Sequence, residues 1–182
     1  QPRPHIADLS VYGLASLNIP PGKRLVSLAQ NESPFPPSPL ALEAAHKAAS
    51  EGALYPDPSC HALRETIGEV QGLNPDQIIC SAGSMEIIAA LIAVYAGPGD
   101  EVLASDHAYS YFRTAALAAG ATPVSAPEID ITVSVDALLA AITPATRIVC
   151  GANPGNPSGT RITGAELRRL RDVLPDDVIL LI

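Results

Sequence analysis

The sequence contains no tryptophan, and only five tyrosines and two phenylalanines among 182 residues. This scarcity of aromatic rings argues against a surface on which nucleic-acid bases stack. Positive charge is also scarce, because eleven lysines and arginines stand against nineteen aspartates and glutamates, for a formal net charge of −8. We therefore expect no nucleic-acid partner.

Cysteine is the next residue in short supply. The three cysteines, Cys60, Cys80 and Cys150, are odd in number and show no C-x-x-C spacing, which argues against a disulfide framework and a zinc knuckle. Cys80 and Cys150 lie in apolar runs and are predicted to be small buried hydrophobic residues. This use of cysteine favours a reducing, cytoplasmic location.

Several common motifs are absent too. The chain has no G-x-G-x-x-G after a strand, no G-x-x-x-x-G-K and no G-x-S-x-G, which excludes the usual dinucleotide, P-loop and serine-hydrolase sites. The four histidines show no metal-ligand spacing, so we expect no metal. The most apolar stretch, residues 78–96, carries Glu86 near its middle. It is therefore predicted to form a buried strand, a turn and a helix, with no membrane partner.

Proline, by contrast, is abundant, with 18 residues, many of them in the first 37 positions. These prolines and the lack of any sustained period predict an extended N-terminal arm over residues 1–38. A helix is predicted to follow from Pro39, with Ser38 as its N-cap and Gly52 closing the segment. A second helix is predicted over residues 59–71, with a glycine at its end.

From residue 77 onward, short apolar runs alternate with helical patterns. Strands are predicted at 77–81, 101–104, 122–125, 147–151 and 178–182. Helices are predicted at 84–96, 109–119, 135–142 and 163–174, and the last of these opens with a capping-box pattern. This alternation predicts a three-layer α/β fold, with a mainly parallel sheet and helices on both faces.

The turn between the first predicted strand and its helix is a candidate anion site. Ligands of open α/β sheets bind at the carboxyl ends of strands. Gly83 allows close approach of the backbone, and the N–H groups of Ser84 and Met85 point outward from a helix N-terminus, beside the Ser84 hydroxyl. These donors suit a phosphate group, and the same residues also suit an ordinary tight turn with a capping serine.

A second informative turn follows the predicted strand 147–151. It reads Asn153-Pro154-Gly155-Asn156-Pro157-Ser158-Gly159, and its prolines and glycines predict a rigid connection. A rigid turn at the end of a strand can hold the amide of Asn156 against a bound ring, where it donates to a phenolate oxygen. The alternative is a surface loop without a ligand.

Six segments, in this order and at similar spacing, resemble the fold-type I pyridoxal-phosphate (PLP) aminotransferases, most closely the histidinol-phosphate aminotransferase branch. They are residues 28–34 (LAQNESP), 55–57 (YPD), 83–86 (GSME), 98–102 (PGDEV), 107–109 (HAY) and 153–159 (NPGNPSG). The resemblance covers roughly residues 25–182. It implies that residues 39–182 form the first part of a cofactor-binding large domain, whose remainder and C-terminal small domain lie outside these residues.

The resemblance also implies pyridoxal phosphate as the cofactor and a homodimer as the assembly. Residues 83–85 would hold the phosphate, Tyr109 would stack on the pyridine ring and Asn156 would donate to its phenolic oxygen. Tyr55 would reach the phosphate bound in the neighbouring subunit, and Asn31 would lie near the substrate. The alternatives are a core-facing ring for Tyr109 and a plain turn residue for Asn31.

Four positions depart from the pattern of the family. Met85 stands in place of an acidic residue, and its backbone N–H stays available to a phosphate. Ser33 replaces the second asparagine of N-E-N, a segment implied in substrate specificity. His107 replaces a proline, and Ser158 replaces a threonine. The resemblance further predicts a cis peptide before Pro157, and a single pocket shared by Ser84, Tyr109 and Asn156.

The implied reaction moves an amino group between an amino acid, or an amino-phosphate such as histidinol phosphate, and a 2-oxo acid. It belongs to amino-acid biosynthesis. The family's cofactor lysine and its aspartate partner of the pyridine nitrogen lie later in the chain than Ile182, so no catalytic residue is predicted here and we expect a piece of a longer protein. A PLP-dependent decarboxylase or lyase of the same fold, and a non-catalytic PLP-fold fragment, are the alternatives.

Overall fold

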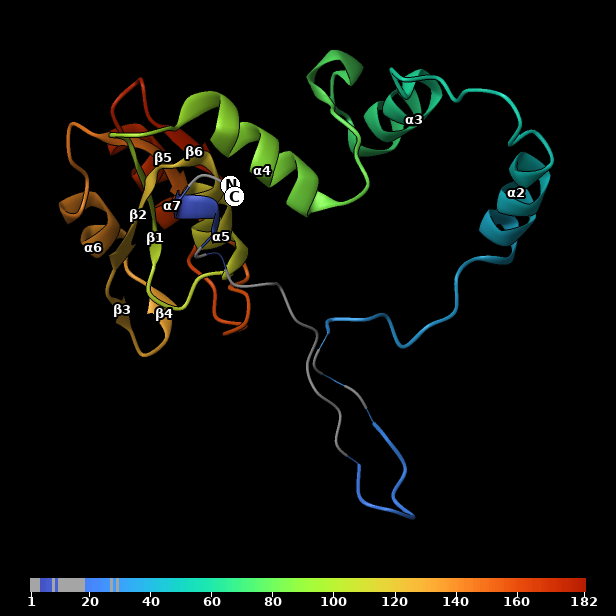
Figure 1. Cartoon of the computed structure of the whole chain (residues 1–182), viewed down its shortest axis with the longest axis horizontal. Helices are drawn as coiled ribbons and strands as arrows, with labels where there is room; N and C mark the ends of the chain where they lie inside the picture. Colours follow the sequence, from blue (N-terminus) through green and yellow to red (C-terminus); the bar gives the residue numbers. More distant parts are fainter. Residues whose placement is uncertain (1–3, 8, 10–18, 27, 29) are drawn as a thin grey trace. The chain divides into compact units, whose positions relative to one another are not determined.

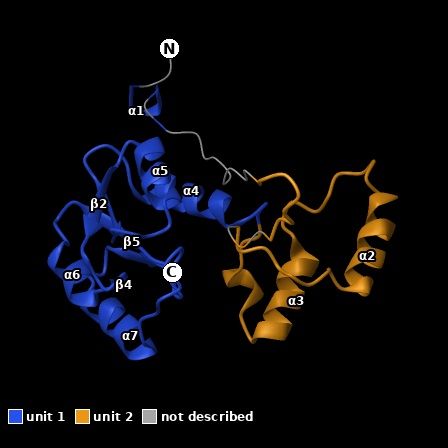
Figure 2. Ribbon diagram, turned by 90° about the horizontal axis from the view of Figure 1, so that it is seen from below, with its two compact units in different colours: residues 1–10, 81–182 blue, residues 11–80 orange. Residues whose placement is uncertain are grey.

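The structure is a computed structural model that describes residues 4–7, 9, 19–26, 28 and 30–182. The chain divides into two compact units, residues 1–10 with 81–182, and residues 11–80, which Figure 2 draws in blue and orange. Within the arm predicted over residues 1–38, α1 (Pro4–Ala7) is a short helix. Residues 19–26 of that arm form neither helix nor strand.

In the unit of residues 11–80, α2 (Pro39–Ala49) and α3 (His61–Gln71) confirm the two predicted helices. Pro39 begins α2, where its missing N–H is not needed. Gly72 ends α3 in the left-handed conformation, with φ 67°.

The strand predicted at residues 77–81 is not formed. A short 3-10 helix, η1 (Pro75–Gln77), overlaps its start, and residues 78–83 have no strand assignment. The reason is that a strand exists only by pairing, and none of the strands in the described ranges pairs with this run. The prediction that this apolar run is buried is only partly correct, since Ile78 is half-buried and Ile79 is exposed.

The unit that contains residues 81–182 is built on a four-stranded parallel sheet (Figure 1). Its strands, in the order β2-β1-β5-β6, are β2 (Thr122–Ala126), β1 (Glu101–Ser105), β5 (Thr146–Cys150) and β6 (Ile179–Leu181). Leu103 stands opposite Val124 on one side and Val149 on the other. The prediction of a mainly parallel sheet is confirmed.

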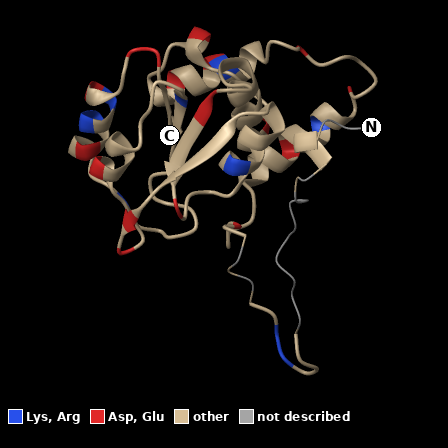
Figure 3. Cartoon of the chain, turned by 60° about the vertical axis from the view of Figure 1, so that its left-hand side comes forward, with Lys and Arg blue, Asp and Glu red and all other residues tan. Residues whose placement is uncertain are grey.

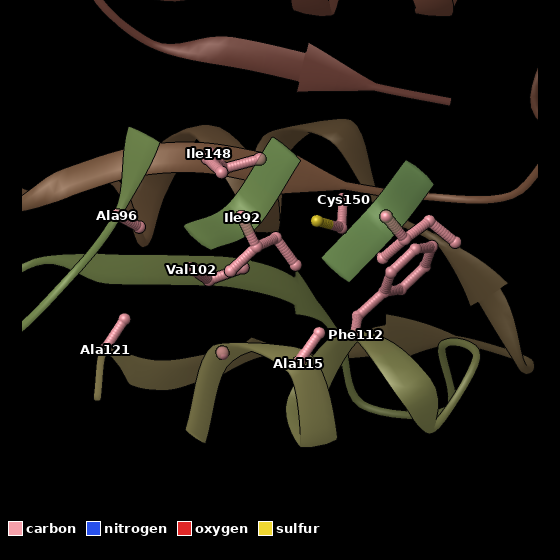
Figure 4. Close-up of a cluster of buried hydrophobic side chains, with 10 residues drawn as sticks. Ile92, Ala96, Val102, Phe112, Ala115, Ala121, Ile148 and Cys150 are labelled. Carbon is pink, nitrogen blue, oxygen red and sulfur yellow. The ribbon is translucent and has the colours of Figure 1, made fainter. Parts of the chain in front are cut away.

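One face of this sheet is covered by α4 (Ser84–Tyr95) and α5 (Tyr111–Ala119). Val102 and Ile148 project from the strands into a buried cluster with Ile92 of α4, Phe112 of α5 and their neighbours (Figure 4). α4 accounts for most of the apolar stretch 78–96. No helix in the described part of the chain is long and apolar enough to cross a membrane.

The other face is covered by α6 (Val135–Ala140) and α7 (Gly164–Val173). Leu103 and Val149, each next in sequence to a residue of the first cluster, project here and pack with residues such as Leu138 and Leu170. Because successive side chains of a strand point to opposite faces, continuous apolar runs fill both clusters. The three-layer prediction is thereby confirmed.

Polar interactions mark the start of α7. Thr163 accepts a hydrogen bond from the Glu166 N–H at 3.2 Å, as the capping-box pattern predicts. In a full capping box the Glu166 carboxylate would also accept from the Thr163 N–H. Here it pairs instead with the Arg169 guanidinium, with Oε2 2.9 Å from Nη2. Charged residues lie mostly on helices and connections, and few lie on the strands (Figure 3).

A two-stranded antiparallel hairpin, formed by β3 (Glu128–Ile129) and β4 (Thr132–Val133), follows β2. Its two turn residues, Asp130 and Ile131, have φ of 49° and 57°, as a two-residue hairpin turn requires. Sequence analysis missed this hairpin because strands of two residues leave no period to detect.

Candidate functional site

The turn before α4 is open and glycine-dependent. Gly83 has φ 123° and ψ 163°, a conformation that essentially only glycine adopts, and it leads into the helix at Ser84. The Ala82 N–H donates to the Glu86 carboxylate at 2.9 Å, which ties the turn to the first turn of the helix. The N–H groups of Ser84 and Met85 have no acceptor among the described residues, as is usual for the first turn of a helix.

Tyr109 follows β1 and precedes α5. Its ring meets the Phe112 ring edge to face, with centroids 5.7 Å apart, and lies 6.1 Å from the ring of Tyr111. The residue is half-buried and packs against the cluster under α4 and α5. Tyr109 thus makes the core contacts that the alternative of a core-facing ring predicts. These contacts support one side of the ring.

The loop after β5 is held closed by Asn153, its third residue. The Asn153 side chain donates to the Ile162 carbonyl and accepts from the Ile162 N–H, both at 3.2 Å, in the manner of a strand pair. Inside the loop, the Gly155 N–H donates to the Thr160 carbonyl at 2.7 Å. A Cβ on Gly155 would collide with the Ser158 hydroxyl, so a larger residue here would have to displace Ser158 from its hydrogen bond with Thr160.

Asn156 lies at the centre of this closed loop and is half-buried. The peptide between Asn156 and Pro157 is cis, which confirms that prediction, and the Asn153–Pro154 peptide is cis as well. Within the described ranges, the side-chain amide of Asn156 makes no hydrogen bond. The amide is therefore available as a donor.

The topology brings these loops to one end of the unit. β1 and β5 are adjacent and parallel, so the loops with Tyr109 and Asn156 leave the same edge of the sheet. Ala96, which caps the end of α4, lies with Ala121 at one end of the cluster, and Phe112 and Cys150 lie at the other (Figure 4). The first turn of α4 therefore points toward the carboxyl ends of the strands.

One pocket at this edge lies on the α6–α7 face, and its lining includes Ser105, Cys150, Asn153 and Ile162. Burial raises the pKa of the Cys150 thiol to about 12, so this sulfur is not a nucleophile at neutral pH. A pocket shared by Ser84, Tyr109 and Asn156 stays a prediction.

The two remaining predicted residues belong to the unit of residues 11–80. Tyr55 lies in the loop before α3 and is fully exposed. Asn31 is exposed and has a positive φ of 52°. Their roles toward a cofactor and a substrate stay predictions.

Sequence analysis missed one charged residue beside the Tyr109 loop. Glu128, at the start of β3, accepts a hydrogen bond from the backbone N–H of His107 at 3.2 Å. The available signal was the histidine itself, which stands where the resembling family has a proline and so adds an N–H. The partner lies 21 residues away and could not be identified from spacing.

The donor set at this edge has a consistent chemistry. It consists of backbone N–H groups, the Ser84 hydroxyl and the Asn156 amide, and the loop after β1 adds the half-buried Tyr109 ring. Helix N-terminal N–H groups suit a phosphate, and an amide suits a ring oxygen. These residues therefore fit a phosphorylated, aromatic cofactor.

Comparison with known proteins agrees with this chemistry. Residues 23–182 match the family model described as aminotransferase class I and II. The chain is 46% identical over 181 residues to the histidinol-phosphate aminotransferase of Ruegeria sp. (strain TM1040), covering 100% of this chain and 50% of that protein. It is equally 46% identical over 182 residues to the enzyme of that name from Rhodopseudomonas palustris (strain HaA2), with the same coverage. The chain thus spans about half the length of these curated relatives.

Solved structures share the fold. Histidinol-phosphate aminotransferase from Sinorhizobium meliloti, solved in complex with pyridoxal-5'-phosphate, matches with a TM-score of 0.79 and 28% identity, covering 83% of this chain and 41% of that one. The aspartate aminotransferase from Rhizobium meliloti matches with a TM-score of 0.77 and 24% identity, covering 99% of this chain and 50% of that one, which supports the fold alone. The chain belongs to the class I and II aminotransferase family.

Proposed function

We propose that the complete protein is a PLP-dependent aminotransferase that moves an amino group between histidinol phosphate, or a related amino-phosphate or amino acid, and a 2-oxo acid. The observation that carries the proposal is 46% identity to histidinol-phosphate aminotransferases over the whole of this chain. The donor set at the carboxyl edge of the sheet supports it independently.

The proposed roles follow from the chemistry of each side chain. The N–H groups of Ser84 and Met85 and the Ser84 hydroxyl bind the phosphate, and Gly83 leaves room for it because no atom lies within 4 Å of where its Cβ would stand. Tyr109 lies against the ring, with Phe112 supporting it on its other side. Asn156 donates to the phenolic oxygen.

Pyridoxal phosphate, when bound, supplies the electron sink that chemistry at an amine-bearing carbon requires. The residues of this chain position it and exclude water from one of its sides. A phenolate oxygen that accepts from a neutral amide stays negatively charged more easily, and this favours the reactive form of the ring. The residues that move protons are proposed to lie outside residues 1–182.

Three further features belong to the same proposal. The protein is a homodimer, in which Tyr55 of one subunit reaches the phosphate bound in the other and Asn31 lies near the substrate. Residues 1–38 form an arm, and residues 39–182 form the first part of the cofactor-binding domain. The location is cytoplasmic, in line with three cysteines that are all unpaired.

The test is an assay of the complete gene product with pyridoxal phosphate, histidinol phosphate and a 2-oxo acid. Amino transfer that depends on both substrates supports the proposal. A parallel assay with an amino-acid donor, which unlike histidinol phosphate carries a carboxyl group, tests the alternative: release of carbon dioxide without transfer identifies a decarboxylase of the same fold. Absence of any cofactor absorbance after addition of pyridoxal phosphate identifies a non-catalytic protein.

A further inference from the structure

Donors from the end of β1 converge on the carboxylate of Glu128. The backbone N–H of His107 donates to Oε1 at 3.2 Å, and Nδ1 of the His107 ring lies 3.0 Å from Oε2. The hydroxyl of Ser105 also favours the ionised form of this carboxylate. The Glu128 side chain is 6% exposed, whereas that of His107 is 65% exposed. The Glu128 carboxylate is thus the buried partner of this contact, which we call the anchor, and the His107 ring lies on its solvent side.

The ionised form of Glu128 is stabilised by these contacts. Burial by itself raises the pKa of a carboxyl group, because it removes the charged form from water. The hydrogen bonds from Ser105 and from the backbone and ring of His107 outweigh this effect, so the pKa of Glu128 is lowered. Glu128 is therefore a charged acceptor at neutral pH, and bonds to charged acceptors are the stronger kind.

The anchor stands on a hairpin that also holds the second cofactor loop. Glu128 pairs with Val133 across the β3–β4 hairpin. At the tip of the hairpin, the carbonyl of Ile131 accepts a hydrogen bond from the Thr160 hydroxyl at 2.9 Å. Thr160 belongs to the loop that carries Asn156. The hairpin therefore contacts the loop after β1 through Glu128 and the loop after β5 through Ile131.

The loop after β1, which Glu128 holds through His107, also carries Tyr109, the residue proposed to stack on the cofactor. His107 stands two positions before Tyr109. The Ala108 N–H donates to the Ser105 carbonyl at 3.1 Å, so the short segment between them is a tight turn. The Tyr109 ring is supported by Phe112. The Tyr109 carbonyl accepts from the Phe112 N–H at 3.0 Å, so the start of α5 holds the residue from one side, and Glu128 holds the loop two residues before it through His107.

We propose that Glu128 is a positioning residue, which holds the loop of residues 105–109 so that Tyr109 presents its ring to the cofactor. This inference rests on the proposed function. It assigns a role in cofactor binding to a carboxylate that touches neither cofactor nor substrate. Small errors in placement are costly at such sites, because reacting groups must be held in a narrow range of geometries.

The test uses the complete gene product and the variant E128Q, which keeps the shape of the side chain and removes its charge. D130N is the matched control, since it removes one negative charge from the same hairpin and asparagine tolerates the left-handed conformation of that turn. Two readouts are needed: hydrogen exchange at the amides of His107 and Ala108 without cofactor, and the affinity for pyridoxal phosphate from fluorescence titration.

We expect E128Q to exchange these amides faster and to bind pyridoxal phosphate about threefold to thirtyfold more weakly, since it weakens bonds to a charged acceptor. The visible circular dichroism of the bound cofactor should change with it, because the ring tilt changes. D130N should match the parent protein in both readouts and in the circular dichroism. H107A should lose part of the affinity that E128Q loses. The double variant E128Q/H107A should lose no more than E128Q alone, because both substitutions break the same contact.

An E128Q protein that folds and equals the parent in exchange and affinity overturns the inference, as does an equal effect of D130N. If E128Q does not fold, H107A decides instead: unchanged exchange at Ala108 and unchanged affinity in H107A overturn the inference. A parent protein that binds no pyridoxal phosphate overturns the proposed function instead, and the amide exchange of E128Q still reports whether the anchor holds the loop.

Discussion

At the scale of single residues, Gly83 carries more constraint than its small size suggests. Its φ of 123° with ψ 163° lies in a region that residues with a Cβ avoid, yet a Cβ there would meet no atom within 4 Å. The cost of a side chain at this position is therefore backbone strain and not a clash. The strain would be relieved only by moving the N–H groups that begin α4.

We predict that G83A lowers the free energy of unfolding by about 1–3 kcal/mol, the cost of one residue held in such a conformation. G97A is the control, because Gly97 also faces open space but has no positive φ, and we expect a change within about 0.5 kcal/mol. Denaturant unfolding of both variants measures the difference. Equal losses of unfolding free energy in the two variants would show that a side chain at position 83 does not strain the backbone.

Asp57 is a second residue with a specific and testable task. Its carboxylate accepts from the Ser59 N–H at 2.9 Å, the Ser59 hydroxyl at 2.7 Å and the His61 N–H at 2.8 Å. The last of these donors is the first residue of α3, whose N-cap residue, Cys60, makes no side-chain cap. Asp57 thus caps the helix from outside its usual position.

These hydrogen bonds lower the pKa of Asp57 from 3.8 to about 2. The bond from the Ser59 hydroxyl has the largest effect, and the bond from the His61 N–H has the next largest. Because the folded state favours the carboxylate, its contribution is present above pH 3.8 and is lost as the pH falls through about 2. We predict a carboxyl titration with that midpoint by NMR, accompanied by faster exchange of the His61 amide. In D57N this pH dependence should disappear. A midpoint near 3.8 in the parent protein contradicts the cap.

At the scale of elements, local signals predicted most of the helices and non-local contacts explain the misses. α5 was predictable because Gly120 stops it, in the left-handed conformation, within its own segment. The strand expected at residues 77–81 failed because pairing depends on a neighbour that no local pattern reveals. In the candidate site, the motifs around Ser84 and Asn156 predicted their turns, and the cis peptide before Pro157 confirms the form of the second turn. Glu128 was missed because its contact with His107 spans 21 residues.

The loop after β5 is the element whose closure can be tested most directly. We predict that N153A opens it, since the variant removes both hydrogen bonds to Ile162. At about 0.5–1.5 kcal/mol for each bond, the Ile162 amide should exchange about tenfold faster or more. The Gly151 amide, bonded to the Leu181 carbonyl at 2.9 Å, is the control within the same protein. Unchanged exchange at Ile162 would mean that the loop is closed by its other contacts.

At the scale of the whole unit around the sheet, β5 connects the two buried layers. Ile148 and Cys150 face the cluster under α4 and α5, and Val149 faces the cluster under α6 and α7. All three are at most 2% exposed. The Cys150 sulfur therefore meets solvent when the α4–α5 layer separates from the sheet or the sheet opens at its carboxyl edge. The reactivity of this thiol is accordingly a measure of how far the layer around it opens.

We predict that iodoacetamide at pH 8 modifies Cys60 and Cys80 in the folded protein and leaves Cys150 unmodified. Cys60 and Cys80 are half-buried, whereas burial raises the pKa of Cys150 to about 12, so that almost no thiolate is present to react. Peptide mapping by mass spectrometry follows each site separately, and denaturant should bring Cys150 to the rate of the other two. With G83A, labelling of Cys150 should begin at lower denaturant, since the strained turn starts a helix of the same cluster. Labelling of Cys150 in the folded protein as fast as Cys60 would show that the layers open without global unfolding.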